Sequence, residues 1–584
     1  TELWRAPCFE NYDTQLDVFV LDGVVWVGKL RHRGDPGFTK GRDVRSGKVV
    51  ATIPNNLKFY NVRMGHHRCY RNRATTRYLL LGRDGIEFVD PKNGTGTGCW
   101  WVRGTCQYGV MPANGLIYAP PHSCACHPAE KLNGFNVLAP RPAAADGPGA
   151  LDEGPAYGAD LAAQAEGDGQ WPTYRRDARR SGFQDLDAPR DPAVAWSATL
   201  REPVTAPVAA GGRVFVAETE RHTLRALSQR DGQPAWTFIA DGRIDSPPTI
   251  AAGRCIFGTR NGFVYCLRAA DGALAWRFHP AGSQRLVFAY ERLESVWPVH
   301  GSVLIAQSEE GQAPVVYAAA GRSSHLDGGI RLVALDLATG KPRHQAVVTM
   351  NPGPETQDAI KQRALPGILS LQHGSLFLRH VRLDKTLAHQ GKAQPHLYAP
   401  GGFLDDTWWH RTYWVYGTTM QSGYGGWPRV GNRVPAGRLL AFDGGDTIYG
   451  YGRMRYRAGA GHVHPDATRD YKLFAEAIAP EPDKKRRRKR GGGRDVHWAK
   501  ELPFVARSVV LTRDALLVAG GGSLAQSADD HGPGVLWVGA RKDGARRAAC
   551  KLPAPPVLDG MAYTAAGIYL ATLDGRVLCL RDRK

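Results

Sequence analysis

The chain has 584 residues, of which 43% are hydrophobic, and its formal net charge is +20. That hydrophobic share supports a core and excludes a chain that is disordered throughout. No stretch of the sequence approaches the ~20 consecutive apolar residues of a membrane-spanning helix. One run of basic residues at 484–490 supplies seven of the positive charges, and a single run does not make a nucleic-acid-binding domain.

The composition predicts an all-β chain. The 69 glycines, 39 prolines and 15 tryptophans suit many short strands joined by tight turns. Repeated units follow one another, with predicted boundaries at 8–52, 60–103, 107–200 (interrupted), 203–239, 245–279, 296–349, 364–455, 504–552 and 555–584, the last completed by residues 1–7. Of these nine predicted units, we expect one to be an extension of a neighbour, the first or the interrupted third.

The first quarter of the chain is dense in histidine and cysteine. Thiolates and imidazoles at this density could bind zinc, copper or haem iron. Disulfide bonds that pin an irregular loop, or side chains that are merely packed, would explain the same pattern. Since Cys124-Ala-Cys126-His127 is one residue short of the haem-attachment motif, covalent haem is not expected. The candidate metal ligands are His67, Cys69, Cys106, His122, Cys124, Cys126 and His127.

The clearest repeat lies in the middle of the chain. Arg225–Phe238 matches Tyr265–Phe278, which places Trp236 and Trp276 40 residues apart. Each copy has an alternating strand, an Asp-Gly turn and a strand that carries the tryptophan. The tryptophan supplies a large apolar surface between neighbouring sheets. Four antiparallel strands at this period indicate a propeller blade, whereas the alternative, a β-sandwich, needs no fixed period.

Two cysteines lie within this repeat. The segment Cys255–Cys266 reads as a hairpin whose turn is at residues 259–262, and a four-residue loop would place the two cysteines opposite each other. Cross-strand Cβ atoms are about 4.5–5.5 Å apart and a disulfide needs about 3.5–4.5 Å. We therefore consider either a strained disulfide or two buried free thiols.

Two clusters are candidate catalytic sites. His325 beside Asp327, in the glycine-rich segment 321–329, could act as an acid or base, although a hydrogen-bonded turn is the favoured explanation. The second cluster could bind a cation or a sugar next to several tryptophans, or could cap strand ends. It contains Asp405, Asp406, His410 and Arg411.

Two insertions are predicted. Residues 141–170, rich in alanine, glycine and proline, are expected to form a mobile loop. Residues 456–500, which contain the basic run, are expected to form an exposed excursion.

The two ends of the chain predict closure of the repeat. Residues 568–580 read as the second and third strands of a unit without its tryptophan strand, and Thr1–Ala6, with Trp4, reads as a tryptophan strand without its unit. We therefore predict one closed β-propeller over residues 1–584, with about eight four-stranded blades and with the N-terminal strand completing the last blade. Because the chain does not begin with methionine, we expect a processed product or a part of a larger chain.

The segment Trp171–Gly182 and the two tryptophan-phased units carry a resemblance. There the chain resembles the pyrroloquinoline-quinone (PQQ)-like repeat propellers, a superfamily that includes PQQ-dependent alcohol dehydrogenases and the outer-membrane β-barrel assembly lipoprotein, and it is also similar to bacterial PQQ-binding-like β-propeller repeat proteins. The dehydrogenases of the superfamily hold PQQ against a disulfide of adjacent cysteines. This chain has no Cys-Cys dipeptide, so bound PQQ is not expected.

Two functions fit these features. The first is a binding or scaffold propeller for a protein or a glycan, located in the periplasm or at the cell surface, with no nucleic-acid partner. The second is a metal- or redox-dependent enzyme, a quinoprotein-like oxidoreductase with its site at the propeller axis. Paired cysteines would agree with an oxidising compartment. We expect a monomer or a part of a larger chain.

Overall fold

The structure, a computed structural model, describes residues 1–6, 17–27, 38–54, 71–82, 85–99, 102, 104–105, 108–121, 135–140, 147–159, 169–201, 203–289, 292–306, 314–324, 326–349, 367–391, 394–399, 414–418, 432–455, 471–478, 494–522 and 532–583. Their secondary structure is β, as predicted, apart from one 3-10 turn, η2 (Thr219–Arg221). None of these ranges forms a helix of the length and apolarity that crossing a membrane requires.

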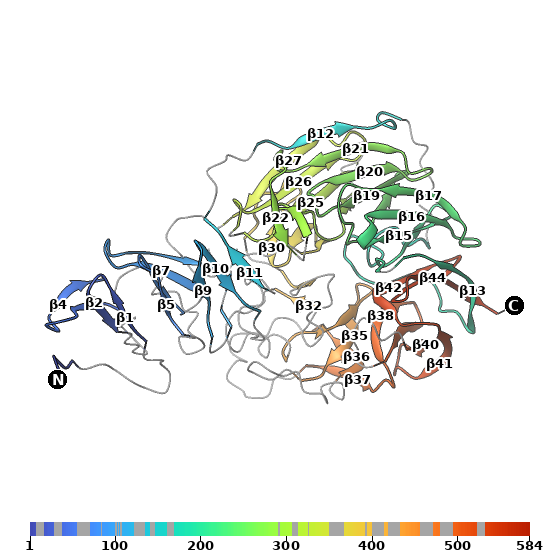
Figure 1. Ribbon diagram of the computed structural model, residues 1–584. Helices are drawn as coiled ribbons and strands as arrows, with labels where there is room; N and C mark the ends of the chain where they lie inside the picture. The colour runs from blue at the N-terminus through green and yellow to red at the C-terminus, as the bar shows by residue number, and fades with distance from the viewer. Residues whose placement is uncertain are drawn as a thin grey trace.

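Three sheets, here called the arm sheets, form the N-terminal part of the structure and lie beside one another in Figure 1. Sheet a contains β1 (Val18–Leu21), β2 (Val24–Val27), β3 (Lys40–Asp43) and β4 (Val49–Thr52); sheet b contains β5 (Arg73–Ala74), β6 (Leu79–Leu81), β7 (Ile86–Asp90) and β8 (Thr95–Cys99); sheet c contains β9 (Met111–Ala113), β10 (Leu116–Ala119) and β11 (Asn136–Leu138).

The remaining sheets, here called propeller sheets 1 to 8, follow one another along the chain. Sheet 1 contains β14 (Val208–Ala210), β15 (Arg213–Glu218), β16 (Thr223–Ser228) and β17 (Pro234–Ile239); sheet 2 contains β18 (Thr249–Ala251), β19 (Arg254–Gly258), β20 (Val264–Arg268) and β21 (Leu274–His279), with β12 (Ala150–Glu153) added at the edge. Sheet 3 contains β24 (Leu304–Ala306), β25 (Val315–Ala320), β26 (Ile330–Asp336) and β27 (Pro342–Val348); sheet 4 contains β28 (Leu369–Gln372), β29 (Ser375–Leu378) and β30 (Val381–Leu383).

Sheet 5 contains β31 (His396–Tyr398), β32 (Trp414–Gly417) and β33 (Ala436–Gly437); sheet 6 contains β34 (Leu439–Ala441), β35 (Thr447–Arg453), β36 (Tyr471–Ala477) and β37 (Val496–Lys500). Sheet 7 contains β38 (Val505–Leu511), β39 (Ala515–Gly521), β40 (Gly534–Ala540) and β41 (Arg546–Leu552); sheet 8 contains β42 (Pro556–Thr564), β43 (Gly567–Thr572) and β44 (Arg576–Asp582), with β13 (Pro192–Thr199) at the edge. A separate hairpin, β22 (Leu286–Ala289) and β23 (Arg292–Ser295), lies between sheets 2 and 3 in the chain.

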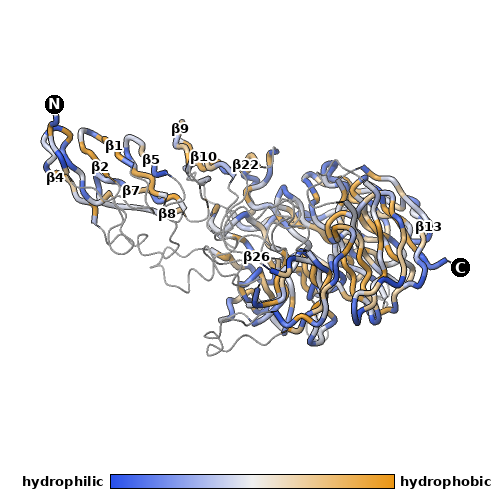
Figure 2. The backbone as a smooth tube through the Cα atoms, turned by 90° about the horizontal axis from the view of Figure 1, so that it is seen from below, coloured by the Kyte–Doolittle hydropathy of each residue, from blue (hydrophilic) through white to orange (hydrophobic). Residues whose placement is uncertain are grey.

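The first strands of neighbouring propeller sheets lie side by side. β14 contacts β42, β18 contacts β24, β24 contacts β28, β28 contacts β31, β34 contacts β38, and β38 contacts β42. Sheet 8 is therefore a neighbour of sheet 1 as well as of sheet 7, and one apolar cluster joins sheets 7, 8, 1 and 2. Figure 2 shows hydrophobic residues along the strands of this region and hydrophilic residues at many of the connecting turns.

One tryptophan contact recurs, four times between neighbouring propeller sheets and once between residues 1–6 and arm sheet a. In each case the indole N–H donates to a backbone carbonyl three residues before a glycine with positive φ, and the ring lies over that glycine. The pairs of tryptophan and accepting carbonyl are Trp4 and Val44 (2.9 Å), Trp196 and Gln229 (3.1 Å), Trp236 and Ala269 (3.0 Å), Trp276 and Leu337 (3.2 Å), and Trp498 and Arg541 (3.2 Å).

The prediction that residues 1–7 complete the last blade is wrong. The outer strand of sheet 8 is β13, which pairs antiparallel with β44 from Pro192↔Asp582 to Thr199↔Arg576. β13 carries Trp196 at the same phase as the other docking tryptophans. Trp4 instead docks on the turn that follows β3 in arm sheet a, so residues 1–6 are engaged elsewhere.

Three other boundaries differ from the prediction. The predicted unit 364–455 holds sheets 4 and 5 and the first two strands of sheet 6. β36 and β37 lie within the predicted excursion 456–500, whose basic run is outside the described residues. Within the predicted mobile insertion 141–170, β12 pairs with β21, from Ala150↔His279 to Glu153↔Trp276.

The predicted register that places Cys255 opposite Cys266 is wrong, and of the two alternatives for these cysteines the buried free thiols are confirmed. In the hairpin of β19 and β20, Gly258 pairs with Val264, so the loop has five residues and Cys255 lies opposite Leu267 instead of Cys266. Neighbouring positions on a strand face opposite sides of the sheet, and the two cysteines belong to different apolar clusters. The cysteines that the structure describes are free thiols, and no disulfide occurs among them.

The tryptophan contact predicts a difference between two glycines. Both Gly272 (φ +77°) and Gly212 (φ +75°) adopt the left-handed conformation, but a Cβ on Gly272 would meet the Trp236 ring at 2.6 Å, whereas a Cβ on Gly212 would meet nothing within 4 Å. We expect Gly272→Ala to lower the free energy of unfolding by about 1–3 kcal/mol more than Gly212→Ala. Thermal and urea midpoints of the two variants would measure this, and equal losses would contradict the role of the contact.

Candidate functional site

Most residues predicted to form a site lie outside the described part of the chain. This holds for the candidate metal ligands His67, Cys69, Cys106, His122, Cys124, Cys126 and His127, and for the candidate catalytic residues His325, Asp405, Asp406, His410 and Arg411. They stay predictions. Of the candidates, the structure describes Asp327, and within the described ranges no group of three or more His, Cys, Asp or Glu side chains is placed to hold a metal ion.

Residues 169–188, here called the axial segment, contact the first strands of several propeller sheets. They contain the motif Trp171–Gly182 that was singled out in the sequence. Its backbone bonds to sheets 1, 2, 4, 6 and 7 are Trp171 N to Ala209 O (2.9 Å), Ile250 N to Pro172 O (2.7 Å), Leu371 N to Ala178 O (2.8 Å), Phe442 N to Ser181 O (3.0 Å) and Leu511 N to Gly182 O (2.9 Å). The segment therefore runs along the first strands of five propeller sheets.

Two buried arginines of the axial segment bind different sheets. Arg180 donates to the carbonyls of Leu369 at 3.0 Å and Ser302 at 3.2 Å, and burial lowers its pKa to about 10, so it remains charged at neutral pH. Arg175 Nη1 lies 2.7 Å from Asp559 Oδ1 in sheet 8. The partners named here are backbone carbonyls and one carboxylate of the propeller region, so the two arginines hold neighbouring sheets together.

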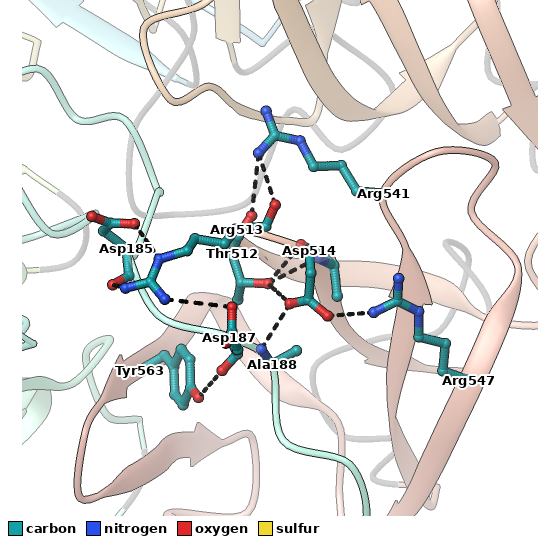
Figure 3. A network of polar contacts seen from close by, with 10 residues as sticks. Asp185, Asp187, Ala188, Thr512, Arg513, Asp514, Arg541, Arg547 and Tyr563 are labelled. Atoms are coloured by element: carbon teal, nitrogen blue, oxygen red, sulfur yellow. Dashed lines mark hydrogen bonds and ion pairs between the residues drawn. The ribbon is translucent and has the colours of Figure 1, made fainter.

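The end of the axial segment is attached to sheets 7 and 8 (Figure 3). Arg513 Nε lies 2.7 Å from Asp185 Oδ1, and the Asp514 carboxylate accepts the Ala188 N–H at 2.9 Å. Tyr563 donates its hydroxyl to the carbonyl of Asp187 at 2.6 Å. The side chains of the Arg513–Asp185 ion pair are largely exposed, so this pair contributes at most about 1 kcal/mol. These contacts attach the axial segment to sheets 7 and 8, and they do not form an arrangement of catalytic side chains.

The hairpin β22–β23 is the candidate functional site. The connections between the second and third strands of propeller sheets 1, 2 and 3 contact this hairpin, and the face that carries them is here called the loop face. Figure 2 shows β22 at the margin of the propeller region. Phe288 pairs with Leu293 and Val287 pairs with Glu294. Because alternate residues of a strand face opposite sides, Phe288 and Leu293 share one face and Glu294 lies on the other.

Glu294 anchors the buried face of the hairpin. Its side chain is 2% exposed, and its Oε2 lies 2.7 Å from Arg322 Nη2 and 3.5 Å from Arg260 Nη1. Arg260 also pairs with Asp245. Arg260 comes from the β19–β20 connection and Arg322 from the β25–β26 connection, so one buried carboxylate of the hairpin joins the loops of sheets 2 and 3.

The base and the tip of the hairpin have separate anchors. At the base, Arg285 pairs with Asp327 and lies over the ring of Trp297, with the guanidinium carbon 4.9 Å from the ring centroid. Trp297 Nε1 donates to the Asp327 carbonyl at 3.1 Å. At the tip, Arg292 pairs with Glu220 of η2. Asp327 therefore has a part in holding the hairpin, and its proposed catalytic role stays a prediction.

The outward face of the hairpin is apolar. Leu286, Phe288 and Leu293 lie on this face and are 50%, 71% and 65% exposed. Single exposed apolar residues are ordinary, but a contiguous group on a rigid element marks an interaction surface. The hairpin is thus clamped by charges on one side and presents an aromatic and two aliphatic side chains on the other.

The clamp predicts a large effect of one substitution. Glu294→Gln would remove the buried negative partner of Arg322 and one of the two of Arg260, which keeps Asp245, and breaking a buried ion pair costs about 3–5 kcal/mol. The control Asp271→Asn breaks a partly exposed pair with Arg268, which is worth about 1 kcal/mol or less. Hydrogen exchange of the peptide 286–295 should accelerate in the first variant and not in the second; unchanged protection in Glu294→Gln would contradict the clamp.

A pH effect follows from His300, which lies near the clamp. Burial, together with the positive charges of Arg260 and Arg322, holds the pKa of His300 well below its usual range. The unfolded chain takes up this proton near pH 6.5 while the folded chain does not. Stability contributed by neutral His300 is therefore present above pH 6.5 and is lost as the pH falls below it. We expect thermal midpoints to fall less between pH 7.5 and 5.5 in His300→Gln than in the wild type; equal slopes would contradict this.

Comparison with known proteins adds an independent observation. Residues 184–382 match the family model described as outer membrane protein assembly factor BamB. The chain is 30% identical over 147 residues to BamB of Vibrio cholerae, covering 24% of this chain and 33% of that protein. It is 37% identical over 68 residues to BamB of Moranella endobia, covering 12% and 17%. The matched part thus spans a third or less of the length of these relatives.

Solved structures with similarity include quinohemoprotein alcohol dehydrogenase from Comamonas testosteroni, at 13% identity and a TM-score of 0.45, covering 73% of this chain and 85% of that one. Another is BamB from Moraxella catarrhalis, at 15% identity and a TM-score of 0.30, covering 68% and 90%. The family match and the BamB relatives confirm that the chain resembles the PQQ-like repeat β-propellers, most directly over residues 184–382.

Proposed function

We propose that this chain is a propeller scaffold that binds a protein partner through the outward face of the hairpin β22–β23. The observation that carries the proposal is the contrast between the two faces of the hairpin: Glu294 is buried among arginines, while Phe288 and Leu293 are exposed. An apolar group held on a rigid support loses little conformational freedom on binding. Aromatic anchors of this kind supply much of the energy of protein interfaces.

The support itself is proposed to be one closed ring formed by propeller sheets 1 to 8. The pairing of β13 with β44 and the contact of β14 with β42 favour closure. Closure would leave neither the first nor the last propeller sheet with an uncovered apolar face and would fix the loop face as a stable platform. In this proposal the predicted single propeller over residues 1–584 is narrowed to residues 169–583 together with the added edge strand β12, and the arm sheets lie outside the ring.

The class of partner is inferred from the family match. A factor for outer-membrane protein assembly works with proteins, so we propose a protein partner and a location in the periplasm or at the cell surface. A glycan partner stays a prediction. The alternative, a metal- or redox-dependent enzyme with its site at the axis, rests on residues of which only Asp327 is described, and no described contact favours it.

The proposal predicts crosslinking at position 288. We would place a photo-reactive phenylalanine analogue at Phe288 and, as a control, at Ile239, since each of these side chains is 71% exposed. In the cells that make this protein, position 288 should give one discrete crosslinked protein species and position 239 should not.

The captured protein would then be purified and titrated with the full chain. Burying a phenylalanine is worth about 1.5–3 kcal/mol, so Phe288→Glu should weaken binding at least about tenfold, whereas Ile239→Glu should leave the Kd unchanged. Identical crosslinks at both positions, or equal Kd values for the wild type and Phe288→Glu, would overturn the proposal.

A further inference from the structure

The two edges of the hairpin β22–β23 have different surroundings. The edge of β23 is engaged by the connections of sheets 2 and 3: Ser295 N–H donates to the carbonyl of Arg260 at 3.0 Å, and the carbonyl of Ser295 accepts from Arg322 Nη2 at 3.2 Å. The hairpin forms a sheet of two strands, and no strand of the described residues pairs with the other edge, that of β22. Within the described part of the chain, the edge of β22 is therefore open for strand pairing.

The register identifies the backbone groups on the open edge. In an antiparallel pair, hydrogen-bonded positions alternate with positions whose N–H and C=O point away from the partner strand. Val296 N–H donates to the carbonyl of Arg285 at 3.1 Å, so this position is hydrogen-bonded. The next pair, Ser295 and Leu286, therefore directs its backbone groups outward, and those of Leu286 lie on the open edge. Phe288, two positions further along β22, repeats this orientation.

The composition of β22 favours pairing with a further strand. Its sequence, Leu286–Ala289, contains no charged residue and no proline, two features that commonly protect an exposed edge. The outer strand β41, by contrast, carries Arg546. Leu286, Val287 and Phe288 are 50%, 36% and 71% exposed, so both faces of β22 are accessible. An exposed, apolar and unprotected edge of this kind is a template for a strand of another chain.

The chain already contains one strand that is added to an edge in this way. β12 pairs antiparallel with β21 at the outer edge of sheet 2. Gly154 N–H extends the ladder by donating to the carbonyl of Ala275 at 2.8 Å, and the side chain of Asp152 pairs with Arg277 at 2.8 Å. β12 has 4 residues, as has β22. A strand as short as β22 is therefore long enough to hold an extended segment along its edge.

We propose that the protein partner binds the hairpin by strand addition, in which an extended segment of the partner pairs with the backbone groups of Leu286 and Phe288. Main-chain hydrogen bonds supply affinity in such pairing, and alternate side chains supply specificity. Alternate side chains of the added strand lie beside Phe288, so the outward face selects apolar residues. A two-stranded hairpin is marginal in water, and a third strand completes it. This inference rests on the proposed function, because it specifies how the partner engages the hairpin.

Paired substitutions separate the backbone from the side chain. Leu286→Pro and Leu286→Ala both remove the leucine side chain, but only the first removes the N–H on the open edge. Proline is tolerated at an edge position because the bonds to the neighbouring strand are kept. Leu293→Pro and Leu293→Ala are the matched controls, since Leu293 pairs with Phe288 and directs its N–H to the opposite edge. Circular dichroism, with hydrogen exchange of the peptide 286–295, verifies that each variant retains the hairpin.

The measurement is the Kd of each full-chain variant for the protein that is crosslinked at position 288 and then purified. Because one backbone hydrogen bond is lost, Leu286→Pro should bind about fivefold more weakly than Leu286→Ala, about 1 kcal/mol. The two Leu293 variants should bind alike.

The other outcomes separate this inference from the proposed function. Equal Kd values for the two Leu286 variants would overturn strand addition, and the proposed function would stand if Phe288→Glu still weakens binding. An equal effect of proline at positions 286 and 293 would mean that proline distorts the hairpin, and it would overturn strand addition as well. If no protein is crosslinked at position 288, both proposals fail.

Discussion

The docking of a tryptophan on the turn of the next sheet is the contact on which the repeated architecture depends. It combines a hydrogen bond to a backbone carbonyl, worth about 1 kcal/mol, with the burial of a large ring against a glycine that has no side chain. The glycine must also adopt positive φ, as at Gly232, Gly272 and Gly340. The turn thus connects two strands of its own sheet and also binds the tryptophan of the preceding sheet. This double contact fixes the spacing of successive sheets.

The same contact explains how much of the fold could be predicted. The 40-residue interval between Trp236 and Trp276 identified the blade because both halves of the contact, the tryptophan and the Asp-Gly turn, are local in sequence. The sequence alone predicts the wrong closing strand because the segments around Trp4 and Trp196 both look like a tryptophan strand. The local sequence does not encode which sheet the strand joins or on which turn its tryptophan docks. Sheets 4 and 5 were merged because the described part of neither contributes a docking tryptophan.

The candidate site was less accessible to sequence reasoning. That reasoning selected reactive side chains, whereas the hairpin is held by ion pairs between residues far apart in the chain, such as Glu294 with Arg260 and Arg292 with Glu220. One partial signal is present in the second strand, where Leu293 lies between the charged Arg292 and Glu294, whereas the first strand, Leu286–Ala289, is apolar throughout and shows no alternation. Which side faces water depends on the position of Arg322, and no local pattern gives that.

Buried charges have the same role at the centre and at the loop face. Arg180 and Glu294 are both removed from water, and such desolvation cancels much of the energy that their partners return. Their effect is therefore on geometry more than on stability: each joins backbone or side chains from at least two sheets, so the sheets cannot shift independently. A surface whose backbone is supported in this way loses less conformational entropy on binding than a mobile loop would.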